Sequence, residues 1–255
     1  MAYRPRIGVT MRLESETRRF YLGRDYSEAL EAVGAIPIHM ALIPKADYIA
    51  KIMNGLDGLL LPGSDSDVDP EYYGEQPHLK SGRVVPEKDQ TDLMALAEAE
   101  RLNIPVLGIC FGMQSLNVSR GGSLIQDIAS QIDNAIKHEQ GIPRERNSHS
   151  IRIEPGTILE SLAGKGSEKV KVNSHHHQAI KAVGKDLSAT AWTKDGVIEC
   201  IEDNRENRFV LGIQWHPELS WHSDPLSKKI FDVFVENCVR SNNFKRKSGL
   251  AKSNA

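Results

Sequence analysis

The sequence has few cysteines and no long apolar run. Three cysteines occur in 255 residues, Cys110, Cys200 and Cys238, and they are too scattered for the disulfide framework of a small secreted protein. No stretch approaches 18 consecutive apolar residues, so no membrane-spanning helix and no membrane partner are expected. Residues 1–10 lack the apolar segment of a signal peptide. These features predict a reduced, cytoplasmic setting.

The sequence also lacks an excess of positive charge. Its 32 Lys and Arg residues face 34 Asp and Glu residues, for a net charge of −2. Nucleic-acid-binding proteins usually carry a basic excess, so no nucleic-acid partner is expected. A basic cluster, Lys245-Arg246-Lys247, lies in the segment 241–255, which we predict to be a flexible tail. A nuclear-import or nucleic-acid patch is the alternative for that cluster.

What remains is an ordinary globular composition, 40% hydrophobic and 26% charged. One α/β domain over residues 1–240 fits this length, as would two smaller domains. Apolar strand-like runs alternate with amphipathic helical patterns in the first half. Strands are predicted at Arg6–Thr10, Ile36–Met40, Gly58–Leu61 and Ile104–Ile109, and helices at Arg24–Val33, Ala46–Met53, Asp89–Leu102 and Phe111–Arg120. This alternation is typical of a mostly parallel sheet with helices on both faces.

The second half has a different pattern. Short strands are predicted at Ser148–Ile153, Lys169–Val172, Leu187–Trp192, Val197–Glu202 and Phe209–Gln214, and a last helix at Pro225–Val239. Turns such as Asp195-Gly196 indicate hairpins. We therefore predict a three-layer α/β fold, with a mostly parallel central sheet and an antiparallel strand extension.

The most informative motif is Gly108-Ile109-Cys110-Phe111-Gly112, which follows an apolar run. Glycines two positions before and after a nucleophile allow the sharp strand-to-helix turn known from Gly-x-Ser-x-Gly hydrolases. Here the nucleophile would be the thiol of Cys110, at a helix N-terminus that favours its reactive form. The alternative is a buried cysteine in a Gly-rich turn.

A partner for this thiol occurs about a hundred residues later, in Gln214-Trp215-His216-Pro217-Glu218. His216 follows a predicted strand, as Cys110 does, and functional sites of open α/β sheets form at the carboxyl ends of strands. Pro217 keeps the chain extended after His216, so Glu218 can reach back and fix the imidazole tautomer. Cys, His and carboxylate together are the parts of a thiol-dependent acyl-transfer enzyme. A surface His-Pro turn with a solvent-facing acid is the alternative.

Two other clusters have competing interpretations. Backbone N–H groups of Gly63 or Ser64, with that of Phe111, could hold an oxyanion, although an ordinary strand-end turn is the alternative. The run Asp65-Ser66-Asp67-Val68-Asp69 suggests calcium, but position six of such a loop must be Gly and is Pro70 here.

The run His175-His176-His177 suggests a metal. Adjacent residues of a strand point to alternate faces, so the three cannot share one ion, and a structural zinc needs four ligands at specific spacing. We therefore expect no metal site and interpret the run as a substrate-contacting loop.

At this level of detail the sequence resembles the class I glutamine amidotransferase-like proteins. Within them it is most similar to the γ-glutamyl-γ-aminobutyrate hydrolase family of C26-type peptidases. The matching stretches are residues 57–63, 67–75, 105–122, 121–127, 172–178, 195–199 and 211–218. The strand-to-helix turn around Cys110, called the elbow, and the His-Pro-Glu motif are common to all class I glutaminase domains. The stretches Asp67-Val68-Asp69-Pro70 to Glu75 and Asn173 to Gln178 point to the hydrolase branch.

The resemblance implies a flavodoxin-like fold and a set of roles. Cys110 would be the nucleophile, His216 the base and Glu218 the residue that orients it. Gln114 and Ser174-His175 align with positions that hold the glutamyl head group. The reaction would need no metal and no organic cofactor, and it would belong to polyamine catabolism.

Two residues depart from the family pattern near the expected oxyanion site. Phe111 stands where this branch often has Arg, and Ser64 replaces a common second Gly. These departures bear on the specificity for the leaving amine, not on the triad.

Three functions are consistent with these motifs. The first is a hydrolase of small γ-glutamyl amides, for which a homodimer is one candidate assembly. The second is a glutaminase subunit that delivers ammonia to a separate synthase. The third is a non-catalytic binding module on the same fold.

Overall fold

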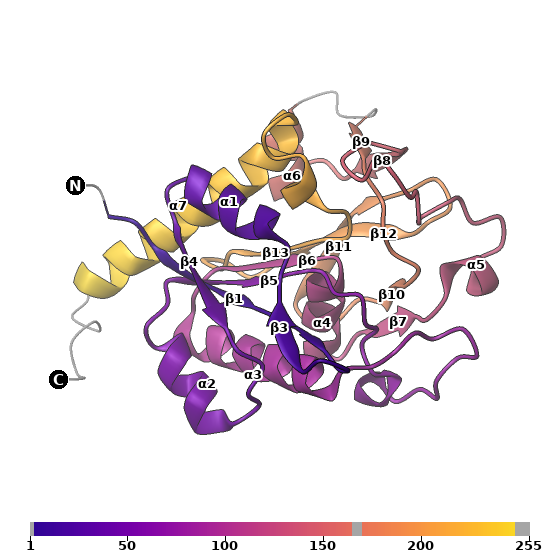
Figure 1. Cartoon of the computed structure of the whole chain (residues 1–255). Helices are drawn as coiled ribbons and strands as arrows, with labels where there is room; N and C mark the ends of the chain where they lie inside the picture. Colours follow the sequence, from indigo (N-terminus) through magenta and orange to yellow (C-terminus); the bar gives the residue numbers. More distant parts are fainter. Residues whose placement is uncertain (1–2, 165–169, 248–255) are drawn as a thin grey trace.

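A mixed, nine-stranded sheet forms the centre of the protein (Figure 1). The computed structural model describes residues 3–164 and 170–247. The strand order is β4 (Ile36–Met40), β1 (Arg6–Thr10), β5 (Gly58–Leu61), β6 (Val106–Ile109), β13 (Val210–Ile213), β12 (Ile198–Asp203), β11 (Leu187–Trp192), β8 (His149–Ile153) and β9 (Val170–Val172). The first five strands are parallel and the last four join antiparallel. This confirms the predicted fold class, including the antiparallel extension.

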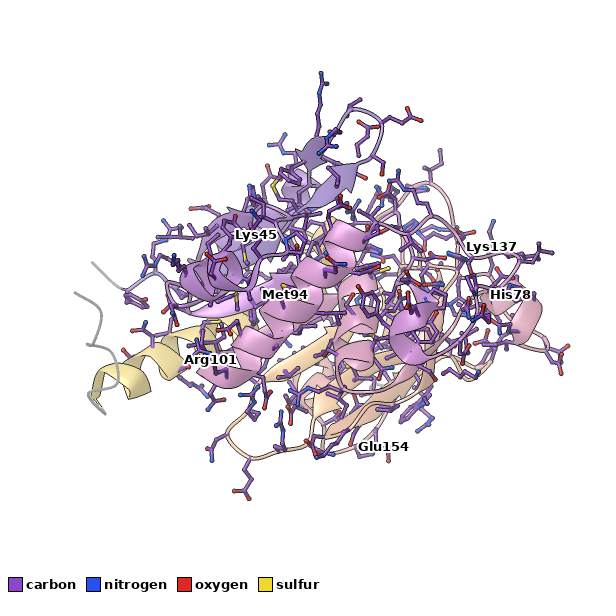
Figure 2. All side chains as sticks on the ribbon, turned by 90° about the horizontal axis from the view of Figure 1, so that it is seen from below. Lys45, His78, Met94, Arg101, Lys137 and Glu154 are labelled. Atoms are coloured by element: carbon purple, nitrogen blue, oxygen red, sulfur yellow. The ribbon has the colours of Figure 1, made fainter. Side chains whose placement is uncertain are left out.

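Helices cover both faces of the sheet, as Figure 1 shows. One layer consists of α1 (Arg24–Ala32), α6 (Ile158–Ala163) and α7 (Pro225–Lys247). The other consists of α2 (Ala46–Met53), α3 (Pro86–Leu102) and α4 (Phe111–Ser119). Seen from below, α3, which carries Met94 and Arg101, crosses this second face (Figure 2).

The two faces of the sheet bury two separate apolar clusters. In β5, Leu60 packs on the side of α1 and α7, whereas Leu59 and Leu61 pack on the side of α2 and α3. All three side chains are fully buried. Successive side chains of a strand point to opposite faces, so a strand covered on both faces reads as a continuous apolar run. This explains the uninterrupted Gly58–Leu61 segment.

Several element boundaries differ from the sequence prediction. Helix α3 starts at Pro86 instead of Asp89, because proline is well suited to the first helical position. Helix α7 continues to Lys247, so the first part of the expected tail 241–255 is helical, and residues 248–255 lie outside the described part of the chain.

The sequence prediction also omitted several short elements. These are the hairpin β2 (Arg12–Glu14) and β3 (Arg19–Tyr21), the pair β7 (Ser123–Ile125) and β10 (Ala179–Ala182), helix α5 (Ile128–Gln131), helix α6, and the 3₁₀ turns η1 (Pro70–Tyr73) and η2 (Pro217–Leu219). Strands of three or four residues are too short to show a hydrophobic period.

Among the described residues, no helix is both long enough and apolar enough to cross a membrane.

Candidate active site

Cys110 occupies a strained turn between a strand and a helix. Strand β6 ends at Ile109 and α4 begins at Phe111, and Cys110 between them has φ 52° and ψ −108°. Its N–H donates to Ile213 O at 2.7 Å, and its carbonyl accepts from Gln114 N at 3.1 Å. A non-glycine residue with positive φ persists only where its surroundings enforce it, and such residues concentrate at functional sites.

The flanking glycines make this turn possible. A Cβ atom added at Gly108 would lie 2.7 Å from Gly112 O, closer than real Cβ contacts. A side chain at Gly112 would collide with the backbone of Leu61 on the neighbouring strand β5. The helix can therefore start directly against the sheet only if both positions are glycine.

The fold brings His216 to the same sheet edge as Cys110. Strands β6 and β13 are adjacent and parallel, and Ile109 pairs with Ile213 in their register. Their carboxyl ends therefore lie side by side, and both Cys110 and His216 line one cavity. His216 Nδ1 lies 2.6 Å from Oε1 of Glu218, which belongs to η2.

The electrostatics of this group favour a protonated imidazole. Burial opposes a charge on His216, but the carboxylate of Glu218 and the sulfur of Cys110 outweigh burial and raise the pKa of His216 to about 10. Burial also opposes ionisation of Glu218, yet the neighbouring His216 and the Tyr26 hydroxyl lower the pKa of that carboxyl. His216 is therefore able to donate a proton at neutral pH.

Residues outside the triad fix its position. The side chain of Asn173 holds the backbone of His216 from both sides: Nδ2 donates to His216 O at 2.8 Å, and Oδ1 accepts from His216 N at 2.9 Å. Gly63 packs against the imidazole, since a Cβ there would lie 2.7 Å from His216 Cε1. Tyr26 and Arg12 in turn hold Gly63: its N–H donates to Tyr26 Oη at 3.0 Å, and its carbonyl accepts from Arg12 Nε at 2.6 Å.

Tyr26 and Arg12 were not identified from the sequence. In the sequence, Tyr26 looked like one more apolar position of a helix. In the structure, burial raises the pKa of Tyr26 well above the ordinary value, so its hydroxyl stays protonated. Asn173 was noted only as part of the run that ends at Gln178.

The catalytic candidates open onto a cavity of about 320 Å³, a volume suited to a small ligand. Its lining combines the thiol and imidazole with cationic, anionic and amide groups. The lining residues are Arg12, Ser64, Asp65, Ser66, Asp67, Cys110, Phe111, Gln114, Glu139, Arg144, His175, His176, His177, Gln178 and His216.

Most of the residues expected to bind substrate lie at this cavity. Ser64, Phe111, Gln114 and His175 line it. The His175 ring meets the His216 ring edge-on, with centroids 5.8 Å apart. Burial lowers the pKa of His175, so its ring is neutral at pH 7.

Two positions, Ser174 and Gly63, serve differently from the expectation. Ser174 is fully buried and does not line the cavity, because its hydroxyl donates to the carbonyl of His138 at 2.7 Å. The N–H of Gly63 is engaged by Tyr26, so it is not available to an oxyanion. Phe111 N–H remains a candidate, since it belongs to the first residue of α4 and has no acceptor within that helix.

Phe111 and Ser64, the two residues that differ from the family pattern, each contact a nearby side chain. Phe111 is 1% exposed, and the Lys88 ammonium lies 5.1 Å from the centre of its ring. Lys88 is itself buried and forms an ion pair with Asp92. The Ser64 hydroxyl lies 2.8 Å from that of Ser66.

The acidic run after Ser64 is engaged in protein contacts. Asp65 accepts from Tyr21 at 2.7 Å, and Asp67 lies 2.8 Å from His177 Nε2. Asp69 caps η1 by accepting from Glu71 N at 3.0 Å. The three histidines 175–177 diverge as expected for adjacent residues: His175 bonds to Arg144 O and His177 to Asp67, while His176 points to a different group of side chains.

The chain is similar to several known proteins. The model of the family "Peptidase C26" matches residues 5–218. The glutamine amidotransferase-like protein YvdE of Lactococcus lactis is 40% identical over 198 residues, which cover 77% of this chain and 80% of YvdE. The γ-glutamyl-γ-aminobutyrate hydrolase PuuD of Escherichia coli is 32% identical over 246 residues, which cover 92% of this chain and 93% of PuuD.

A solved structure shares the fold. The crystal structure of a GMP synthase subunit protein from Thermoplasma acidophilum superposes with a TM-score of 0.64 at 15% identity, over 96% of this chain and 100% of that one. At this identity the likeness concerns the fold alone. The family match spans both the Cys110 elbow and the His216-Pro217-Glu218 motif, and this chain belongs to the peptidase C26 family of hydrolases, with a class I glutamine amidotransferase-like fold.

Proposed function

We propose that this protein hydrolyses small γ-glutamyl amides, such as γ-glutamyl-γ-aminobutyrate, through a thioester on Cys110. The observation that carries the proposal is that Cys110 and His216 line one cavity, with the buried Glu218 2.6 Å behind His216 Nδ1. In such a triad the sulfur attacks, the imidazole moves the proton and the carboxylate orients the imidazole.

The first half-reaction releases the amine. The Cys110 sulfur attacks the γ-carbonyl carbon, and the oxyanion lies toward the N-terminus of α4, where the N–H of Phe111 has no acceptor within the helix. The C–N bond then breaks, and protonated His216 gives its proton to the departing nitrogen. The raised pKa of His216 suits it to this step, because its ring already carries the proton.

The second half-reaction releases glutamate. His216 is neutral after the first step, so it can take a proton from an entering water molecule. The resulting hydroxide attacks the thioester carbonyl, the C–S bond breaks, and the sulfur of Cys110 leaves beside the newly formed imidazolium. The cycle regenerates the free sulfur of Cys110 and the protonated His216, and it needs no external oxidant or reductant.

The cavity also suits the charges of a glutamyl head group. This group carries an α-carboxylate and an α-ammonium, and the cavity lining provides both cationic and anionic side chains. Arg12 and Arg144 offer positive charge, and Asp67 and Glu139 offer negative charge. A free γ-glutamyl compound therefore fits better than the apolar part of a peptide.

A substrate panel tests this proposal. The purified protein alone is assayed on a series of γ-glutamyl-amines and on glutamine, with Cys110→Ala as the blank. We expect hydrolysis of γ-glutamyl-amines with release of glutamate. Glutamine hydrolysis that appears only after a partner protein is added would instead identify a glutaminase subunit. Saturable binding without turnover would identify a binding module.

A further inference from the structure

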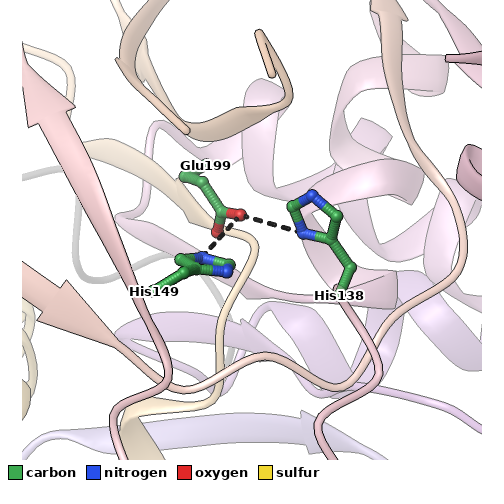
Figure 3. Close-up of side chains that lie close together, drawn as sticks. All are labelled: His138, His149 and Glu199. Carbon is green, nitrogen blue, oxygen red and sulfur yellow. Dashed lines mark ion pairs between the residues drawn. The ribbon is translucent and has the colours of Figure 1, made fainter. Parts of the chain in front are cut away.

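A second cluster of chemically active side chains lies outside the catalytic cavity. His138, His149, His176 and Glu199 converge in the interior, and all four are at least 91% buried. They come from four separate segments: a loop, strand β8, the loop after Asn173 and strand β12. Figure 3 shows His138 and His149 on two sides of the Glu199 carboxylate. The reaction described above uses none of these side chains.

The spacing of the cluster matches a metal coordination sphere. Oε1 of Glu199 lies 3.2 Å from His149 Nε2, 3.7 Å from His138 Nδ1 and 3.6 Å from His176 Nε2. The donor atoms of His138, His149 and Glu199 all lie within 4.8 Å of one another. Ligands about 2.0–2.1 Å from a tetrahedral ion are separated by roughly 3.3–3.4 Å.

Hydrogen bonds on the side of the ring away from Glu199 fix the tautomers of two of these imidazoles. His138 Nε2 lies 3.1 Å from a carboxylate oxygen of Asp195, which can only accept, so this nitrogen carries a proton. His176 Nδ1 lies 2.9 Å from the backbone carbonyl of Gln178, so this nitrogen also carries a proton. In the neutral rings, the other nitrogen of each residue presents a lone pair toward Glu199.

Lone pairs facing a carboxylate repel it unless something positive lies between them. The hydroxyl of Ser174 does not supply the missing proton, because it already donates to His138 O. Glu199 Oε1 lies within ion-pair distance of all three imidazoles. Within the part of the chain that the structure describes, however, neither oxygen of Glu199 forms a hydrogen bond, nor does either nitrogen of His149 or Nε2 of His176. Buried polar atoms are rarely left unpaired in folded proteins.

We propose that His138 Nδ1, His149 Nε2 and Glu199 Oε1 bind a divalent transition-metal ion of the zinc class. His176 Nε2 lies outside this set of three, 3.6 Å from Glu199 Oε1, and would move in as the fourth ligand. Imidazole and carboxylate donors suit zinc, and a closed four-ligand set is typical of a structural site. Asp195 behind His138 and Gln178 O behind His176 are the outer partners that orient metal-binding imidazoles.

This site departs from the sequence expectation that no metal is bound. That expectation concerned the run 175–177, of which only His176 joins the cluster. The other ligands are distant in sequence, and their spacing resembles no short metal motif. The site goes beyond the proposed function and does not depend on it.

The bound ion would act on the catalytic cavity through the loop that carries His176. His176 also lines that cavity, and the neighbouring His175 faces the catalytic His216. The ion would tie this loop to β8 and β12, because His149 and Glu199 lie on those strands. His149 also borders a separate cavity lined by Lys137, Arg146, Lys171 and Lys194, whose positive charge would oppose the entry of a cation. The metal is therefore best supplied while the protein folds.

Metal analysis of the untagged protein tests the proposal. The chain is produced in zinc-supplemented medium with the substitution Cys110→Ala, so that the catalytic thiol cannot hold the ion. We expect about one zinc ion per chain by elemental mass spectrometry. We also expect an X-ray absorption spectrum of nitrogen and oxygen ligands at about 2.0–2.1 Å with imidazole scattering.

Matched variants locate the ion. Glu199→Gln and His149→Gln should each lose at least about 90% of the bound zinc, whereas His39→Gln, on an exposed edge strand, should keep it. A strong chelator present during thermal unfolding should lower the midpoint of the parent protein but not that of Glu199→Gln.

Three results would each overturn the proposal. One is a parent protein with less than about a tenth of an ion per chain, both as purified and after refolding in excess zinc; the cluster would then be a network of protonated imidazoles around a carboxylate. A second is zinc that remains in Glu199→Gln and His149→Gln. If these variants do not fold, sulfur ligands or missing imidazole scattering in the parent spectrum would overturn it equally.

Discussion

His216 Nδ1 lies 2.6 Å from Glu218 Oε1, and only Pro217 separates the two residues in the sequence. Both side chains are almost fully buried. The short η2 turn that begins at Pro217 folds the carboxylate back under the imidazole. The opposite side of His216 is thereby left to face Cys110 and the cavity.

Removal of the nucleophile should abolish turnover and preserve the fold. We expect Cys110→Ala to lower kcat by at least about 10³-fold. His216→Asn should be nearly as damaging, and the double variant no worse than either single one, because nucleophile and base act as a unit. Steady-state kinetics with thermal unfolding as the folding control measure this. More than a few per cent of wild-type kcat in pure Cys110→Ala would rule out the covalent mechanism.

Glu218 should set the alkaline limit of activity. Because Glu218 and Cys110 raise the pKa of His216 to about 10, the proton needed for amine release is present below that pH and is lost above it. Glu218→Gln removes the carboxylate charge that stabilises the imidazolium, so the pKa of His216 should fall. The alkaline limb of kcat/KM should therefore move to lower pH. The loss of kcat should be milder than for Cys110→Ala. An unchanged alkaline limb would contradict this role of Glu218.

Tyr26 should act through Gly63 and Glu218. In Tyr26→Phe the buried N–H of Gly63 loses the acceptor that now lies 3.0 Å away. An unpaired buried donor costs about 1–3 kcal/mol, so the free energy of unfolding should fall by that amount. The matched control is Tyr72→Phe, which should change stability little because Tyr72 is 40% exposed. Equal effects of the two substitutions in chemical denaturation would refute this assignment.

Glu100 should contribute a pH-dependent part of the stability. Its carboxylate accepts from Arg205 at 2.8 Å and also pairs with Arg208 and Arg120, and these contacts lower its pKa to about 2. A depressed pKa gives stability that is present above the ordinary value of about 4.5 and lost as pH falls through 2. Because the Glu100 side chain is 39% exposed, solvent screens these pairs and the effect should be at most about 1 kcal/mol.

The corresponding experiment compares thermal midpoints of Glu100→Gln and wild type. The difference should be visible at pH 7 and should shrink below about pH 4. The neighbouring Glu98→Gln, whose carboxylate pairs with Arg101, serves as the control. A difference that grows on acidification would have the wrong sign for this explanation.

The sequence predicted the elements that carry the catalytic triad better than it predicted their surroundings. The motif around Cys110 implied the strand-to-helix turn, because glycine spacing is a local property. The strand before His216 placed it at the same sheet edge. Both inferences follow from short stretches and from one rule about parallel sheets.

The residues that the sequence did not identify depend on contacts between distant segments. Tyr26 reaches Gly63 only because α1 lies beside the segment that follows β5, and nothing in its own helix signals this. Ser174 looked like a substrate contact, yet it is turned toward His138 by a loop more than thirty residues away. The cluster around Glu199 likewise forms only when β8, β11 and β12 pair in their observed register. No local period encodes such pairings.

The central claim is that Cys110 alone among the three cysteines takes up the glutamyl group. Cys200 and Cys238 are fully buried, and burial raises the pKa of Cys200 well above its usual value, so it should be inert. A diazoketone analogue of glutamine should therefore label only the peptide that contains Gly108–Gly112, and the adduct should retain the glutamyl part. Peptide mass spectrometry of the treated wild-type protein decides the matter. Labelling spread over all three cysteines, or an adduct that lacks the acyl part, would contradict the proposed hydrolase mechanism.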